Sequence, residues 1–159
     1  MRVTPVAAGP EDLARLRRAA FGMILALMIQ FTLGMMVNLF VTIPTNHPGA
    51  HPSEYFSGSA QSYVWAVTQG PVTLVAHVVW GTLLFVGSIA LVVRAWPLHI
   101  RALRWASILG MLLILAAGFN GASFLDFNED FSSMLMAVFF ALAVLSYAAA
   151  LLAVPAAPI

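Results

Sequence analysis

Four long apolar stretches dominate this sequence, and they constrain its fold more than any other feature. They cover residues 21–43, 72–93, 105–124 and 131–154. Each is long enough to cross the hydrocarbon core of a bilayer, which takes about 20 apolar residues in a helix. Because backbone in lipid must satisfy its own hydrogen bonds, we expect each stretch to be helical. The predicted fold is therefore all-α: a polytopic membrane protein with a four-transmembrane-helix up-down bundle in a single domain, residues 21–154.

The composition agrees with this prediction. Of the 159 residues, 62% are hydrophobic and only 8% are charged, whereas soluble domains contain roughly 25% charged residues. The absence of cysteine excludes a disulfide framework and thiolate chemistry. A net charge of +1 gives no reason to expect a nucleic-acid partner. The lipid bilayer is the first expected partner, followed by other membrane subunits or further copies of the chain.

The positions of the basic residues predict the orientation. All seven are arginines, and they lie either before the first apolar stretch or between the second and the third: Arg2, Arg15, Arg17, Arg18, Arg94, Arg101 and Arg104. Cytoplasmic segments of membrane proteins carry such an excess of basic residues. We therefore expect a plasma-membrane protein with both termini cytoplasmic, residues 1–20 as a cytoplasmic lead and residues 155–159 as a cytoplasmic tail.

The two remaining connections then face outward. Residues 44–70 contain Pro44, Pro48 and Pro52, which prevent a continuous helix in the first part of this loop. A short interfacial helix is predicted over residues 59–69, among aromatic residues typical of a membrane interface. Residues 126–130 are predicted to form a tight acidic turn.

Small and polar residues recur every fourth position in the first two apolar stretches. In the second, Thr73, His77 and Gly81 follow this spacing, and His77 is the only side chain in any of the four stretches that can carry a charge near neutral pH. Rows of small residues let membrane helices approach closely, so these sides are expected to face protein. The corresponding row in the first stretch is Gly22, Ala26, Gln30, Gly34 and Asn38.

Combining the spans with the orientation places several polar residues at one depth, a few residues below the outer helix ends. The predicted layer contains Asn38, His77, Asn120 and Met136, and Gln30 lies further along the same row as Asn38. One interpretation is packing, in which Asn38, His77 and Asn120 satisfy one another by interhelical hydrogen bonds. The alternative is a ligand-binding pocket that opens to the outer side, since ionisable residues at membrane depth are commonly functional.

Metal and haem sites are further alternatives to this layer. His47, His51 and Glu54 of the outer loop supply ligand types suited to zinc, copper or iron, although their spacing matches no known metal motif. Among the eight methionines, Met35, Met36, Met134 and Met136 lie in the outer half and are soft ligands for copper. A haem held by His77 together with Met136 or Met35 is a further alternative. No cofactor is predicted as the first choice, because methionine in such stretches is usually a packing residue.

Three classes of function follow from these features. The first is a non-enzymatic membrane protein, either an accessory subunit or a binder of a small or lipid-like ligand through the pocket around His77. The second is a metal- or haem-dependent redox protein that uses His77 or the His47/His51 loop. The third is a small transporter or channel, which is disfavoured because no acidic residue lies within the four stretches.

Overall fold

The computed structural model describes residues 9–98 and 100–154, and every regular element in these ranges is helical. Within them, four helices are long and apolar enough to cross a membrane, namely α1, α3, α4 and α5. This confirms the predicted all-α class and the four apolar spans. Residues 1–8 of the predicted lead, which include Arg2, and the predicted tail lie outside the described residues. The elements are α1 (Pro10–Phe40), α2 (Tyr55–Thr68), α3 (Val72–Ala95), the 3₁₀ helix η1 (Trp96–Leu98), α4 (Arg101–Phe127) and α5 (Asp130–Ala153).

Helix α1 is longer than the first apolar stretch because it already begins within the N-terminal lead. Pro10 occupies its first turn, and Glu11 and Asp12 follow. Proline fits at this position because its missing N–H would have no intrahelical partner, and acids are favoured by the helix dipole. The helix ends at Phe40 rather than at residue 43, and Val41 adopts an extended conformation.

Helix α2 begins earlier than predicted, at Tyr55 instead of residue 59. The reason is a side-chain cap: the Glu54 carboxylate accepts hydrogen bonds from the backbone N–H groups of Phe56 (3.1 Å) and Ser57 (2.6 Å). These are donors that the first turn of a helix otherwise leaves unpaired.

Helix α4 extends beyond the predicted 105–124 at both ends, so the acidic turn is shorter than expected. Asp126 lies in the last turn of α4, and Asn128 ends the helix with a φ of 54°. Asparagine tolerates this left-handed conformation better than most residues. The two remaining spans lie close to their predicted ranges, with α3 at 72–95 and α5 at 130–153.

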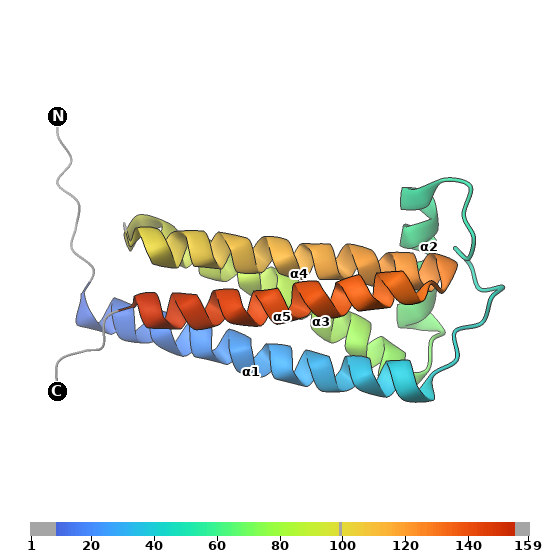
Figure 1. The fold of residues 1–159 in the computed structure, drawn as a ribbon, viewed down its shortest axis with the longest axis horizontal. Helices are drawn as coiled ribbons and strands as arrows, with labels where there is room; N and C mark the ends of the chain where they lie inside the picture. Colours follow the sequence, from blue (N-terminus) through green and yellow to red (C-terminus); the bar gives the residue numbers. More distant parts are fainter. Residues whose placement is uncertain (1–8, 99, 155–159) are drawn as a thin grey trace.

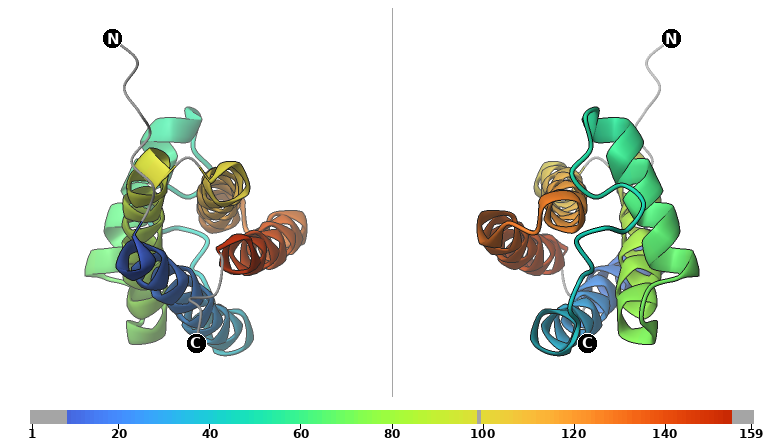
Figure 2. Two further views of the ribbon diagram at one scale, coloured as in Figure 1. Left: turned by 90° about the vertical axis from the view of Figure 1, so that its left-hand side faces the viewer. Right: turned by 90° about the vertical axis from the view of Figure 1, so that its right-hand side faces the viewer.

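The four long helices surround a common axis. α1 packs against α3 and α5, and α4 also packs against α3 and α5, so the contacts close a ring (Figures 1 and 2). α2 contacts α3 and α4 and lies at the end of the bundle where α1 ends and α5 begins (Figure 1). We call this end the α2 end, and the opposite end, where α1 begins and α5 ends, the arginine end.

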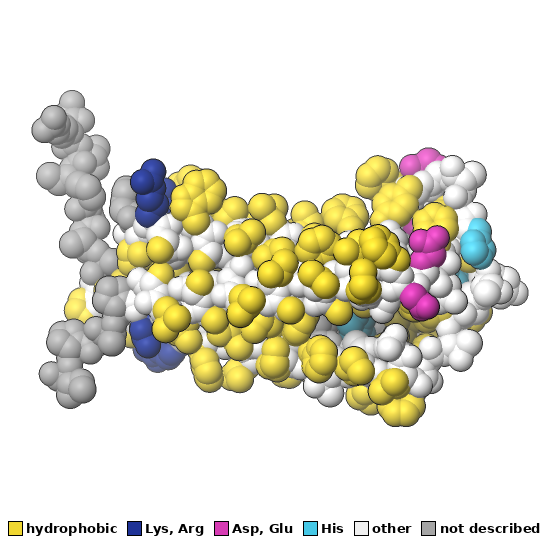
Figure 3. Space-filling model, in the orientation of Figure 1, with side chains coloured by type: hydrophobic (Ala, Val, Ile, Leu, Met, Phe, Trp, Pro, Cys, Tyr) yellow, Lys and Arg dark blue, Asp and Glu magenta, His cyan; other side chains and the backbone are white. Residues whose placement is uncertain are grey.

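The distribution of charge distinguishes these two ends. Arginine surface lies at one end of the visible face and acidic surface at the other (Figure 3). At the arginine end, Arg17 of α1 donates hydrogen bonds to the backbone carbonyls of Leu151 (3.4 Å) and Val154 (2.7 Å). These bonds satisfy carbonyls that the end of α5 leaves unpaired, and they fasten α1 to α5.

The buried hydrophobic side chains of the bundle form two separate clusters. The larger cluster of buried side chains occupies the arginine-end half and includes Leu16, Leu91, Leu103 and Tyr147. The smaller cluster lies under α2 at the opposite end and consists of Val37, Ile43, Trp65, Ala66, Leu74 and Leu125. Members of both clusters line a cavity in the bundle.

Candidate ligand-binding cavity

A cavity of about 670 Å³ lies in the α2-end half of the bundle. Members of both clusters form parts of its wall, among them Leu27 and Leu84 from the larger one and Val37 and Leu74 from the smaller one. Its size is within the range of about 300–1,000 Å³ that is usual for small-molecule sites. All five α-helices contribute to the lining, so the cavity exists only in the assembled fold.

The cavity is open at the side of the bundle. Figure 3 shows histidine surface inside a hollow of the visible face, between α5 and α1. Around the cavity, α1 contributes Phe31 and Met35, which are 50% and 40% exposed, and α5 contributes Met134, which is 53% exposed. In a bilayer this side would face acyl chains, so an apolar molecule has a direct route from the lipid into the cavity.

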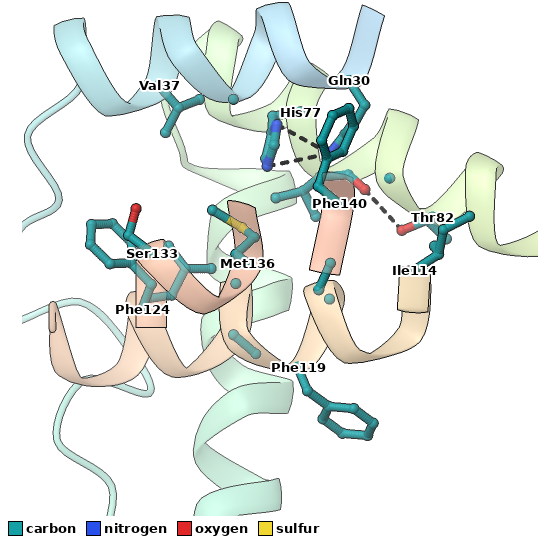
Figure 4. Close-up of a pocket in the computed structure, with 18 of the residues that line it drawn as sticks. Gln30, Val37, His77, Thr82, Ile114, Phe119, Phe124, Ser133, Met136 and Phe140 are labelled. Atoms are coloured by element: carbon teal, nitrogen blue, oxygen red, sulfur yellow. Dashed lines mark hydrogen bonds between the residues drawn. The ribbon is translucent and has the colours of Figure 1, made fainter. Parts of the chain in front are cut away.

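Gln30 and His77 form the polar centre of the cavity (Figure 4). The Gln30 side-chain amide, on α1, donates to the imidazole of His77, on α3. Its Nε2 lies 3.1 Å from Nδ1 and 3.3 Å from Nε2 of the ring. This pair joins the two helices that carry the predicted rows of small and polar residues.

A glycine on the opposite helix makes room for each member of this pair. A Cβ atom added at Gly34 of α1 would lie 3.0 Å from Cε1 of His77, and one added at Gly81 of α3 would lie 3.1 Å from Nε2 of Gln30. Both distances are shorter than ordinary carbon contacts. The polar residue and the glycine are four positions apart in each helix, which puts them on one side of that helix. The two rows therefore pack against each other, with His77 beside Gly34 and Gln30 beside Gly81.

The Gln30 amide is only half satisfied. Its Oε1 is buried and accepts no hydrogen bond, although its Nε2 is bonded to His77. Most buried side-chain acceptors in folded proteins have a partner, and an unpaired one requires an explanation. This oxygen is covered by its protein neighbours, so the Gln30–His77 hydrogen bond is the polar contact at the centre of the cavity.

The remaining lining is mainly apolar. No Asp, Glu, Lys or Arg contributes to it, and its few other polar side chains include Asn38, Ser133 and Tyr55. Met136 of α5 lies over a glycine of α4: a Cβ atom added at Gly121 would be 3.3 Å from the methionine sulfur. Figure 4 shows Met136 directed into the bundle, as a packing residue of the cavity wall.

The predicted polar layer is only partly assembled. Gln30, Asn38, His77 and Met136 line the cavity. Asn120 is not among the lining residues, and its Nδ2 donates to the backbone carbonyl of Ala116 in its own helix, 2.9 Å away. His77 lies level with Gln30 and Gly34 rather than with Asn38. Estimating depth from helix ends failed here because α1 and α3 do not end at the same level.

The three candidate metal ligands of the outer loop have separate roles. Both ring nitrogens of His47 face backbone carbonyls, those of Pro48 (2.8 Å) and Leu125 (3.0 Å), and the ring stacks on Trp65. His51 packs its ring against an aromatic residue of α4, and Glu54 caps α2. Within residues 9–98 and 100–154, no group of three or more His, Cys, Asp or Glu side chains is placed to hold a metal ion.

Sequence reasoning missed the residues that position α2 over the cavity. The Ser59 hydroxyl donates to Oδ2 of the buried Asp126 (2.6 Å), and the Tyr55 hydroxyl lies 2.8 Å from the hydroxyl of Ser123. Tyr63 of the same helix is 3.1 Å from the Thr82 hydroxyl on α3. The only sequence signal for these contacts was the presence of an acid and hydroxyl residues in segments predicted to share one side of the membrane.

The fold and the cavity together define a class: a helical protein with four apolar helices compatible with integral membrane insertion. Comparison of the chain with protein-family models, with curated proteins and with solved structures found no match.

Proposed function

We propose that this protein is inserted in the plasma membrane with its arginine end in the cytoplasm. The support is the placement of Arg15, Arg17 and Arg18 near the start of α1, of Arg94 in the last turn of α3, and of Arg101 and Arg104 in the first turn of α4. By the positive-inside tendency, both termini are then cytoplasmic, and the cavity and α2 belong to the outer half.

We further propose that the protein is a non-enzymatic binder of a small or lipid-like ligand, which occupies the cavity around His77. One observation carries this proposal: an open cavity of about 670 Å³ has mainly apolar walls and one polar centre, the hydrogen-bonded pair of Gln30 and His77. Apolar walls with a few placed polar groups are characteristic of ligand sites. Association with other membrane subunits or with further copies of the chain remains a prediction.

Two glycines offer a matched test of the cavity. Gly118 lines it, whereas Gly22 on α1 does not, and a Cβ atom added at either position meets nothing within 4 Å. Gly118→Phe places a ring at the cavity wall, and Gly22→Phe adds the same ring elsewhere. We expect Gly118→Phe to reduce the retained apolar ligand at least about tenfold, equivalent to about 1.4 kcal/mol of binding free energy.

The measurement is native mass spectrometry of the protein released from detergent, with the retained molecules counted per chain. The Gly22→Phe protein should retain as much ligand as the unmodified protein. Equal retention in all three proteins, or none in the unmodified protein, would show that the cavity is not a binding site.

A further inference from the structure

Contacts between described residues close three of the four helix interfaces around the cavity. Gln30 and His77 join α1 to α3, and Met136 of α5 packs on Gly121 of α4. The interface between α3 and α4 is covered by α2, which contacts both helices. The residues that α2 contributes to the cavity wall are Tyr55, Phe56, Ser59, Ala60 and Tyr63. The interface between α1 and α5 has no comparable covering helix.

α1 and α5 are joined toward the arginine end and separate toward the α2 end (Figures 1 and 2). At the arginine end α1 donates hydrogen bonds to backbone carbonyls of α5, and nearer the cavity the rings of Phe31 and Phe140 stack, with their centroids 5.6 Å apart. Beyond this stack, the cavity-lining residues Met35 of α1 and Met134 and Ala137 of α5 are exposed. The cavity therefore opens between α1 and α5, and we call this opening the portal.

The portal leads to lipid, whereas the α2 end of the cavity is closed to water. Both helices that flank the portal are long and apolar enough to cross a membrane, so their exposed apolar residues would face acyl chains. Under α2, each side chain of the smaller cluster is at most 9% exposed. His47, itself buried, stacks its ring on Trp65 of this cluster. A molecule therefore reaches the cavity from the bilayer rather than from the water beyond α2.

The walls of the cavity favour hydrocarbon over a polar head group. Among the described residues that line it, none is Asp, Glu, Lys or Arg, so a charged group would be buried without a counterion. Burying an unpaired charge is far more costly than burying apolar surface. The polar centre offers no alternative partner, because Gln30 and His77 bond to each other and Gln30 Oε1 is covered by its protein neighbours.

We infer that the cavity takes the hydrocarbon chain of a membrane phospholipid, which enters sideways through the portal while its head group stays outside. On the α3–α4 side of the cavity, α2 supplies the apolar contacts. On the α1–α5 side, the lipid chain supplies them. This inference rests on the proposed function, since it specifies the ligand of the same cavity and the route by which it enters.

The test compares two phospholipid probes in phosphatidylcholine nanodiscs. One is a phosphatidylcholine with a diazirine near the methyl end of one chain, and the other carries the diazirine on its head group. After irradiation, mass spectrometry counts adducts on Met136 and Phe140, which line the cavity, relative to those on Leu83, which is 57% exposed on α3 and does not line it. We expect the chain probe to label Met136 and Phe140 at least about tenfold more than the head-group probe, equivalent to about 1.4 kcal/mol.

Two neighbouring positions of α5 assign the labelling to the portal. Ala137 and Val138 are both exposed, and of the two only Ala137 lines the cavity. Ala137→Trp places an indole in the portal, and we expect it to reduce the chain adducts on Met136 and Phe140 by about tenfold relative to Leu83. Val138→Trp, the matched control, adds the same side chain outside the portal and should leave this ratio unchanged.

Failure of this inference is distinguishable from failure of the proposed function. Absence of chain adducts in the cavity, while the purified protein still retains an apolar molecule that Gly118→Phe removes, would overturn the inference and leave the proposed function intact. Cavity adducts unaffected by Ala137→Trp, or head-group adducts as frequent as chain adducts, would also overturn the inference. Absence of both the cavity adducts and the retained molecule would overturn both proposals.

Discussion

At the scale of single residues, the interface between α1 and α3 depends on where side chains are absent. Gln30 and His77 can bond only because Gly81 and Gly34 leave space beside them. Trp80 strengthens the same interface, since its indole N–H donates to the carbonyl of Ala26, 2.9 Å away. The interface therefore combines small residues, which let the two helices approach closely, with interhelical hydrogen bonds, as is common where membrane helices meet.

This arrangement predicts that two glycines of the same interface respond differently to an added methyl group. Gly34→Ala places a Cβ atom 3.0 Å from the His77 ring, whereas Gly87→Ala places one 3.6 Å from the flexible Met23 sulfur, an ordinary contact. Because overpacking costs about 1–3 kcal/mol, Gly34→Ala should be less stable than Gly87→Ala by about 1–2 kcal/mol. Unfolding in a detergent titration, followed by circular dichroism, measures the difference, and equal stabilities would contradict it.

The rows of small and polar residues were predictable, but the pairing within them was not. Spacing of four predicted that these sides of the first two spans face protein; Gln30 and Gly34 of the first row do contact His77 and Gly81 of the second, whereas Gly22 and Asn38 are exposed. The spacing could not indicate that His77 lies beside Gln30 rather than Asn38, because that depends on how far α3 is displaced along α1. The unpaired Gln30 oxygen is likewise visible only once the neighbours are placed.

At the scale of secondary-structure elements, α2 is positioned by polar contacts as well as by packing. Asp126 is 1% exposed, its side chain accepts from Ser59, and its backbone carbonyl accepts from the N–H of His51 (2.8 Å). A residue expected in an exposed turn is therefore a buried anchor that joins α4 to α2 and to the loop before it.

Removing this anchor should loosen α2. We expect Asp126→Ala to destabilise the segment 47–68 by about 1–3 kcal/mol, because the Ser59 hydroxyl loses its acceptor. Glu129→Ala is the control, since Glu129 belongs to the same acidic segment but is exposed. Hydrogen–deuterium exchange of α2 amides is the readout. Faster exchange in both variants alike, or in neither, would mean that Asp126 does not anchor α2.

The helix boundaries show which helix ends can be predicted from the neighbouring residues alone. The start of α1 follows from Pro10 and the acids after it, which the sequence already indicates. The early start of α2 depends on Glu54, an acid that was assigned instead to a candidate metal group. A carboxylate such as that of Glu54 can cap a helix or bind a metal ion, and the sequence alone does not decide between these two roles.

At the scale of the whole molecule, the two halves of the bundle differ in packing, because the cavity lies in the α2-end half. The larger buried cluster occupies the arginine end, and the cavity separates it from the smaller cluster under α2. If the arginine end is cytoplasmic, ligand binding is confined to the outer half. The absence of cysteine allows this orientation to be tested directly.

Single cysteines at the two ends should react from opposite sides of the membrane. Ser53→Cys near α2 and Asp12→Cys in the first turn of α1 replace exposed residues. In intact cells, a membrane-impermeant maleimide should label Ser53→Cys alone, and Asp12→Cys should react only after permeabilisation. The reverse pattern would invert the orientation and move the cavity to the cytoplasmic half.

The sequence by itself determined the class and the spans of this protein, because length and hydropathy are local properties that decide whether a segment suits lipid. It also determined which helix sides are small and polar, since helical periodicity is local too. Only the tertiary structure decided that His77 meets Gln30, that Asp126 is buried and that a cavity separates two packed clusters. The reason is physical: relative helix displacement and unfilled volume arise from side chains distant in sequence, and no single segment contains that information.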